Sequence, residues 1–300
     1  MESSLPSDYA KYVYEMELLS SPLFHITSKK RLAILLHSSL KELNNIVRSK
    51  DQMYQYFNET QTDDSGNIIK VRPIQNPHDR LKQIHSRIGK FLGNLKAPEY
   101  LHSKRSKSAI SNAKAHVGIK GHTLNIDITD FYPSTSRAKI QAFFGYTLQY
   151  PTDIAKYLSE ICTVKNCLPT GSPLSSALAF WANKSMFDEI YRVAKSRAIT
   201  MTVYVDDISF TGRAVNQNFL KKIIQIVGKY QHKIKQEKIK FFPEYSVKFV
   251  TGVAILNGRL QPAHRHYRDI RVLQKIDNDH QATLRLMGKN NYIKQITNQV

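Results

Sequence analysis

Residues 201–212 have the sequence Met-Thr-Val-Tyr-Val-Asp-Asp-Ile-Ser-Phe-Thr-Gly, and this stretch decides the fold of the chain. Apolar and polar side chains alternate before and after the two acids, which predicts two β-strands. The stretch therefore predicts a β-hairpin with Asp206 and Asp207 at its tight turn. Two adjacent carboxylates repel each other at neutral pH, so a cation is expected beside them. Taken alone, an Asp-Asp turn is more often a solvated loop, and chemistry requires a third acid.

Asp127 supplies a third acid. It lies in the alternating segment 123–128, Thr-Leu-Asn-Ile-Asp-Ile, which predicts another strand. The apolar residues of this segment share one face, so Asp127 lies on the other. If this strand neighbours the hairpin in one sheet, three carboxylates meet at its edge. Three acids can hold two Mg²⁺ ions roughly 3.5–4 Å apart, the arrangement used for in-line phosphoryl transfer.

The charge of the chain points to a polyanionic partner. The 300 residues include 44 Lys and Arg against 24 Asp and Glu, for a net charge of +20. Such an excess repels itself unless a polyanion neutralises it. Nucleic acid is the first candidate, and its binding should weaken steeply with salt. An anionic membrane is a weaker candidate, because no isolated basic amphipathic tail is present.

The location and the cysteine chemistry follow from what the sequence lacks. No apolar run of about 18 residues predicts a transmembrane helix, and the first residues lack the pattern of a signal peptide. We therefore expect a cytoplasmic protein with no membrane partner. Cys162 and Cys167 are too few for a closed zinc site, so they are predicted to be reduced thiols.

The rest of the pattern predicts an α+β protein. Helices are expected at residues 28–47, 78–95, from about 137, 173–196, 217–235 and in a basic tail over 261–300. Strands are expected at residues 54–59 and 68–74, which a polar turn at 62–67 joins, and within 245–256.

Three segments together resemble the conserved blocks of a reverse transcriptase. Residues 127–134, Asp-Ile-Thr-Asp-Phe-Tyr-Pro-Ser, are similar to its first catalytic block. Residues 168–173, Leu-Pro-Thr-Gly-Ser-Pro, are similar to the block written LPQGxP, and 204–207 match the Y-x-D-D box. Thr170 stands where the family has glutamine; threonine reaches less far, so fidelity or nucleotide affinity is expected to differ.

Two further elements narrow the resemblance to retron reverse transcriptases. Residues 112–116, Asn-Ala-Lys-Ala-His, are similar to the NA-x-x-H element, and 250–252, Val-Thr-Gly, to the VTG element. The resemblance covers roughly residues 30–290. It implies a right-hand polymerase with fingers and N-terminal helices over 1–122. It also implies an antiparallel-sheet palm over 123–256, with finger elements near 140–170, and a short thumb over 257–300.

The resemblance also implies roles for individual residues. Asp127, Asp206 and Asp207 would be catalytic and, with the main chain of Ile128, would hold two Mg²⁺ ions, Mn²⁺ being an alternative. Tyr132 would be the steric gate that excludes a ribose 2′-hydroxyl. Nucleotide-binding roles fall on Lys70, Arg72, Asp130, Phe131, Tyr132, Thr170, Gly171 and Lys238. RNA- or primer-binding roles fall on Asn112, His116, Val250, Thr251 and Gly252.

Several of these roles have a structural alternative. Lys70 and Arg72 could form an ordinary basic strand face, and Lys238 is one lysine among many. Tyr132 could be a core aromatic. Asn112 and His116 could serve as a helix cap or a core hydrogen bond.

The implied function is synthesis of DNA on a cognate structured non-coding RNA. A guanosine 2′-hydroxyl of that RNA would prime the reaction with deoxynucleoside triphosphates, giving a branched RNA–DNA (msDNA). The family works in bacterial anti-phage defence, usually with a separate effector protein. Two alternatives stay open: an RNA–DNA-binding scaffold that restrains a toxic effector, and another bacterial reverse transcriptase of the abortive-infection or group II intron type.

Overall fold

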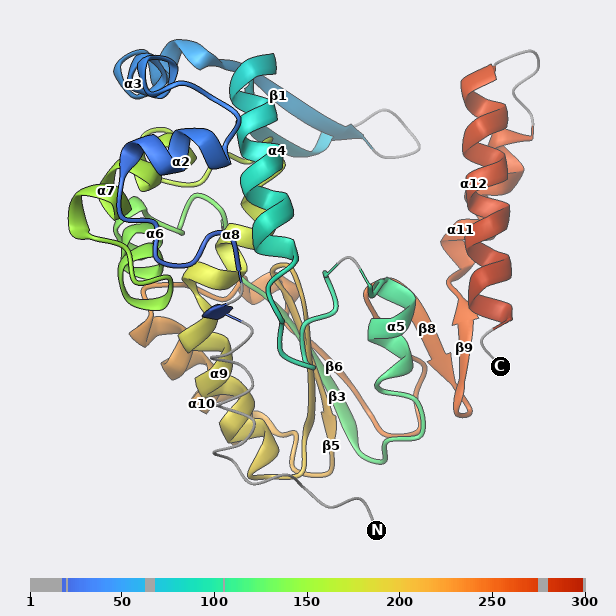
Figure 1. Ribbon diagram of the computed structural model, residues 1–300. Coiled ribbons are helices and arrows are strands. Elements are labelled where there is room, and N and C mark those ends of the chain that lie inside the picture. The colour runs from blue at the N-terminus through green and yellow to red at the C-terminus, as the bar shows by residue number, and fades with distance from the viewer. Residues whose placement is uncertain (1–17, 20, 63–67, 105, 275–279, 299–300) are drawn as a thin grey trace. The chain divides into compact units, whose positions relative to one another are not determined.

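The structure is a computed structural model that describes residues 18–19, 21–62, 68–104, 106–274 and 280–298 (Figure 1). The chain divides into two compact units. The first comprises Met1–Ala97 and Asp130–Ser185, and the second Pro98–Thr129 and Met186–Val300. None of the described helices combines the length and the apolar character that crossing a bilayer requires.

The first unit is a β-hairpin with a set of helices. Strands β1 (Tyr54–Thr62) and β2 (Ile68–Pro77) pair antiparallel from Tyr54 opposite Pro77. This confirms the predicted strand pair; most of its predicted turn lies outside the described residues. The helices are α2 (Lys29–Leu35), α3 (Leu40–Arg48), α4 (Asp79–Gly93), α6 (Arg137–Ala142), α7 (Thr152–Cys162) and α8 (Ser175–Ala182), with short turns η1 (Lys50–Met53) and η2 (Phe143–Thr147). Cys162 and Cys167 are free thiols, as predicted.

Two predicted long helices are each broken in two. The helix expected over residues 28–47 stops at α2, and α3 starts anew, because His37 has a φ of 51° and the Ser39 side chain accepts a hydrogen bond from the Glu42 amide as an N-cap. The helix expected over 173–196 divides at Asn183 into α8 and α9 (Lys184–Lys195). The apolar periodicity continues through both breaks, so it could not reveal them.

The second unit is built on an antiparallel sheet. Among the described residues it contains β3 (His122–Asp127), β4 (Thr200–Tyr204), β5 (Asp207–Gly212) and β6 (Lys240–Phe242), in the order β4-β5-β3-β6. Leu124, Ile126, Ile208 and Phe210 are buried on one face. The Phe210 ring packs edge-on against Phe219 of α10 (Gln217–Lys229), with ring centroids 5.1 Å apart. Helix α10 ends six residues earlier than predicted.

A smaller sheet and three helices complete the second unit. Strands β7 (Lys248–Val250), β8 (Val253–Leu256) and β9 (Arg259–Pro262) form an antiparallel meander. The region predicted as strand over 245–256 is thus a hairpin that turns at Thr251 and Gly252. The helices are α5 (Ala109–Lys114), α11 (His264–Leu273) and α12 (His280–Thr297). Their shared core joins Ile110 and Ala113 of α5, Ile296 of α12 and apolar residues of β7–β9.

Gly121 permits a close backbone approach where β3 begins. It has a φ of +110°, and a Cβ there would lie 2.3 Å from the carbonyl carbon of Gly212. Gly118 also has a positive φ, of +76°, but no atom lies within 4 Å of its Cβ position.

We predict that Gly121→Ala destabilises the chain more than Gly118→Ala. Gly118→Ala should cost about 1 kcal/mol from the left-handed backbone alone. Gly121→Ala must also push β3 and β5 apart, and should cost about 2 kcal/mol more. Urea unfolding of both variants and the wild type measures the difference. Equal losses would contradict the close packing of Gly121 on Gly212.

Candidate active site

The Asp-Asp hairpin is present, but its turn lies one residue earlier than predicted. Tyr204 of β4 pairs with Asp207 of β5, so Val205 and Asp206 form the two-residue turn and Asp207 begins the second strand. Val205 has a φ of 61°. A β-branched residue in this region is strained by about 1–3 kcal/mol, a cost usually found where geometry serves function.

The strand register brings Asp127 and Asp207 together. Asp127 is the last residue of β3 and lies directly opposite Asp207 of β5. Asp206 is tied to the same end of β3, because its carbonyl accepts a hydrogen bond from the Ile128 amide at 3.1 Å. The three acids predicted from sequence therefore lie at one edge of the sheet.

Burial and the neighbouring acids together raise the pKa of Asp207. The Asp207 carboxylate reaches solvent through an open pocket, but the surrounding protein still desolvates it. Desolvation first, and then the charges of Asp206 and Asp127, raise the pKa of Asp207 to about 7. Both causes disfavour the charged form of Asp207, and a cation bound beside it would favour that form.

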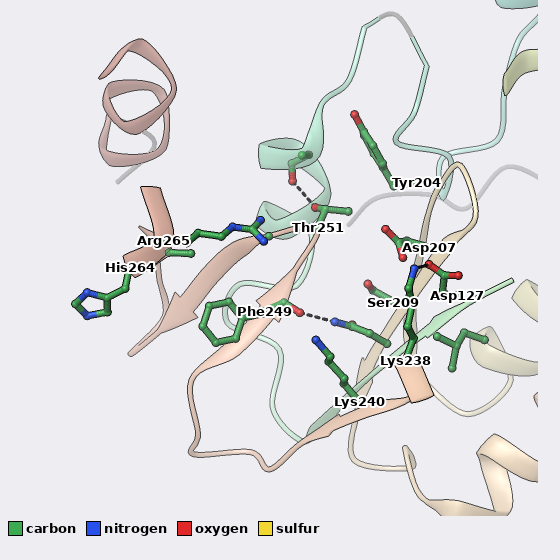
Figure 2. Close-up of a pocket in the computed structure, with 15 residues that line it drawn as sticks. Asp127, Tyr204, Asp207, Ser209, Lys238, Lys240, Phe249, Thr251, His264 and Arg265 are labelled. Carbon is green, nitrogen blue, oxygen red and sulfur yellow. Dashed lines mark hydrogen bonds and ion pairs between the residues drawn. The ribbon is translucent and has the colours of Figure 1, made fainter. Parts of the chain in front are cut away.

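Lys238 partly neutralises this charge. It lies at the end of the short turn η3 (Gln236–Lys238) and forms an ion pair with Asp127 (Figure 2). Desolvation lowers the pKa of Lys238, but the hydrogen bond to Asp127 and the nearby acids outweigh it and leave the pKa above its usual value. One ammonium group cannot balance three carboxylates.

An open pocket of about 710 Å³ adjoins the acids. Figure 2 shows Asp127, Asp207 and Lys238 on one side, Arg265 and His264 on the opposite side, and Phe249 and Thr251 between them. The pocket is thus acidic at one end and basic at the other. Lys240 and Arg265 also line the pocket, and neither had a predicted role. Lys240 begins strand β6, two residues after Lys238. Nothing in the sequence indicated Arg265.

The acids suit a hard divalent cation by their chemistry. Carboxylate oxygens are the ligands that Mg²⁺ and Mn²⁺ prefer, and the crowding of negative charge at Asp207 favours a cation. Among the described residues, no group of three or more His, Cys, Asp or Glu side chains is already gathered in a metal-binding arrangement. The carboxylates would therefore have to adjust around the ions.

Residues predicted to bind RNA or primer meet one another in the second unit. Asn112 and His116 are both 1 % exposed, and Val250 is fully buried. The Asn112 amide donates a hydrogen bond to the Thr251 hydroxyl. Thr251 and Gly252 line the pocket.

Several residues predicted to bind the nucleotide lie in the first unit, on β2 and in the 168–173 loop. Lys70 and Arg72 lie on β2, and Gln75 further along that strand holds the 168–173 loop. The Gln75 side chain accepts a hydrogen bond from the Thr170 amide at 3.0 Å, and its carbonyl accepts one from Gly171 at 3.2 Å. No motif indicated Gln75, whose partner Thr170 lies 95 positions away along the chain.

The other predicted nucleotide residues lie in the turn that precedes α6. Asp130 has a φ of 45°, Phe131 is buried and Tyr132 is half-buried. The Thr135 hydroxyl donates to the Phe131 carbonyl at 2.8 Å and accepts from the Asn183 amide at 2.9 Å. Asn183, at the break between α8 and α9, therefore fixes this turn.

The comparisons with known proteins agree with the geometry. Residues 21–255 match the family model described as reverse transcriptase (RNA-dependent DNA polymerase). The Retron Se72 reverse transcriptase of Salmonella heidelberg (strain 579083-10) is 28% identical over 81% of this chain and 66% of its own length. The Retron Ec86 and Ec48 reverse transcriptases of Escherichia coli are 28% and 25% identical, over 78% and 72% of this chain.

These matches confirm the predicted resemblance to retron reverse transcriptases and the predicted enzyme class. The family implies the right-hand polymerase fold, and the mixed helices and antiparallel sheets agree with it. The matched regions cover 66%, 72% and 56% of the three relatives, so the chain spans between about half and three quarters of their length.

Proposed function

Since the chain belongs to the reverse transcriptase family of RNA-dependent DNA polymerases, we propose that it copies RNA into DNA at Asp127, Asp206 and Asp207. The observation that carries this proposal is the register of the sheet, which sets Asp127 opposite Asp207 at the edge of an open pocket. The family uses divalent metal ions, and we propose two Mg²⁺ ions, or Mn²⁺, as the cofactor.

The acids and the main chain of Ile128 would hold the ions. When bound, two such ions activate the attacking hydroxyl and stabilise the leaving pyrophosphate. Asp127 is oriented through its backbone, because its carbonyl accepts a hydrogen bond from the Lys235 amide at 2.9 Å. Lys238, already beside Asp127, would turn its ammonium group to the leaving phosphate.

The nucleotide would be bound by residues of the first unit. Lys70 and Arg72 would contact the triphosphate, where the planar fork of donors on arginine suits phosphate oxygens. The turn with Asp130, Phe131 and Tyr132 would lie beside the sugar and the phosphates. Thr170 and Gly171 would complete the nucleotide site, and the hydrogen bonds that their amides donate to Gln75 would hold them in place.

The same proposal assigns the three parts of a right hand. Residues 1–122 form the fingers and N-terminal helices, 123–256 the palm with finger elements near 140–170, and 257–300 the thumb. The four-stranded sheet in the described part of the second unit supports the palm assignment. The basic residues of α11 and α12 support a thumb that binds nucleic acid.

The template would be a cognate structured RNA, as in a retron. The relatives named above are retron reverse transcriptases, and a net charge of +20 favours RNA. Synthesis would start from a guanosine 2′-hydroxyl and give msDNA, and the system would act with a separate effector in anti-phage defence within the bacterial cytoplasm.

Sequencing the nucleic acid that copurifies with the chain tests the retron assignment. We predict one structured RNA joined to single-stranded DNA through a 2′ linkage. A mixture of unrelated cellular RNAs, without linked DNA, would contradict the retron assignment but not polymerase activity.

We predict that Asp127→Asn and Asp207→Asn each abolish primer extension on a generic primed RNA template. Loss of a metal-binding carboxylate removes several kcal/mol of transition-state stabilisation, so the rate should fall by about 10³-fold or more. Glu237→Gln, which changes an exposed acid next to Lys238, is the control and should retain activity. Full activity in either aspartate variant would overturn the catalytic assignment.

We predict that Tyr132→Ala increases ribonucleotide incorporation relative to deoxynucleotide incorporation. The aromatic ring would otherwise collide with the 2′-hydroxyl. Tyr132→Phe keeps the ring and should retain discrimination, and Tyr146→Ala changes an exposed tyrosine as a second control. The ratio of kcat/KM for the two sugars is the measurement, and an unchanged ratio in Tyr132→Ala would remove the gate role.

A further inference from the structure

We propose that Asn112 and His116 are positioning residues that join the catalytic hairpin to the Thr251-Gly252 turn, which lines the same pocket. The inference rests on the proposed function, because it explains how that site is held in shape. Both side chains are 1 % exposed, so they present almost no surface to an RNA. Their hydrogen bonds go to the strands and the turn that surround the acids.

His116 joins three strands of the catalytic sheet. Its Nδ1 lies 2.8 Å from the Thr211 hydroxyl of β5, and its Nε2 lies 2.8 Å from the Thr202 hydroxyl of β4. The Thr211 hydroxyl also lies 2.8 Å from that of Thr123 on β3. These three strands carry or flank Asp127 and Asp207, so the imidazole fixes the spacing of the strands behind the acids.

The His116 ring is neutral in this setting. Burial, and then the nearby charges of His102 and Lys248, lower the pKa of His116 to about 3. A neutral imidazole offers one donor and one acceptor, and each faces a threonine hydroxyl that can supply the complementary group. The ring therefore acts as a rigid bridge and carries no charge for RNA.

Asn112 extends this bridge to the Thr251-Gly252 turn. It lies on α5, which contacts β4, β7 and β8. Its amide donates to the Thr251 hydroxyl at 3.4 Å. That hydroxyl in turn donates to the Ala109 carbonyl at 2.9 Å (Figure 2). Ile110 and Ala113 pack beneath the turn on Val250 and Val253.

The turn itself is strained and needs this support. Thr251 has a φ of 45°, and a β-branched residue in the left-handed region persists only where its surroundings hold it. The next residue, Gly252, has a φ of +80°, and a Cβ there would lie 2.1 Å from a guanidinium nitrogen of Arg265.

A continuous set of contacts therefore runs from the acids to the basic side of the pocket. It passes from β4 and β5 through His116 and α5 to Thr251, and from Gly252 to the start of α11. Breaking it should move Arg265 and the turn relative to Asp127 and Asp207. Misplacement of this kind lowers the rate of the chemical step more than it weakens nucleotide binding.

The test compares variants that keep the volume of a side chain but change its hydrogen bonds. His116→Leu and Asn112→Leu remove the polar contacts, and His116→Gln keeps a donor and an acceptor. Primer extension on a generic RNA template gives kcat and the KM for the nucleotide. A filter assay gives the Kd for copurified RNA, and thermal unfolding checks the fold. His122→Leu, at an exposed histidine of β3, is the matched control.

We predict that His116→Leu and Asn112→Leu lower kcat by about 10- to 100-fold, while the KM for the nucleotide and the Kd for RNA change by less than about threefold. His116→Gln should recover much of the lost kcat. Folded variants with unchanged kcat would overturn the inference. Loss of RNA binding with normal extension on the generic template would also overturn it, because the residues would then be RNA ligands.

Two further variants keep the inference testable if the buried substitutions unfold the chain. Thr251→Val removes the hydroxyl from the half-buried turn, and Thr251→Ser keeps it. We predict a lower kcat in the first and near-normal kcat in the second; equal activity of the two would overturn the inference. A wild-type chain that extends no primer on any RNA would instead refute the proposed function.

Discussion

Repulsion between carboxylates at the end of two paired strands is the constraint on which the rest of the site depends. The pairing of β3 with β5 sets Asp127 against Asp207, and burial of Leu124, Ile126, Ile208 and Phe210 fixes that register. A slip of one residue would turn the acids toward the core and the apolar residues toward solvent. The hydrophobic core of the sheet therefore holds in place charges that would otherwise separate.

The second unit contains strained turns that lower its stability but keep this arrangement. Both of its two-residue hairpin turns beside the pocket carry a β-branched residue at positive φ, Val205 and Thr251. Each costs about 1–3 kcal/mol, and the surrounding hydrogen bonds offset that cost. The amide of Ile128 holds the Asp206 turn, and the carbonyl of Ala109 holds Thr251. Backbone strain that the surrounding structure holds in place is typical of functional sites.

Local patterns predicted much of this structure. The alternation around Asp127 and around the Asp-Asp pair predicted β3, β4 and β5, and the motifs predicted the family that the comparisons confirm. Local patterns failed between Leu36 and Ser39 and at Asn183, where one helix ends and another begins while the apolar spacing continues. They also placed Asp207 in the turn, because the position of the turn is set by the pairing of Tyr204 with Asp207.

Contacts between distant parts of the sequence could not be predicted in the same way. Asn112 meets Thr251 across 139 positions, and His116 meets Thr211 across 95. The motifs contain Asn112, His116 and Thr251, but only the structure shows that Asn112 and His116 are buried and which distant residues they contact. Gln75 and Arg265 lie in none of the motifs. Only the structure shows that Gln75 contacts Thr170 and that Arg265 lies beside Gly252.

The most direct test of the central claim is to locate bound metal. Crystals of the chain soaked with Mn²⁺ and measured at the manganese absorption edge would show the ions by their anomalous signal. The account predicts an anomalous peak within coordination distance of the carboxylates of both Asp127 and Asp207. Crystals of catalytically active protein in which Mn²⁺ binds elsewhere, and leaves these two carboxylates without a ligand, would contradict it.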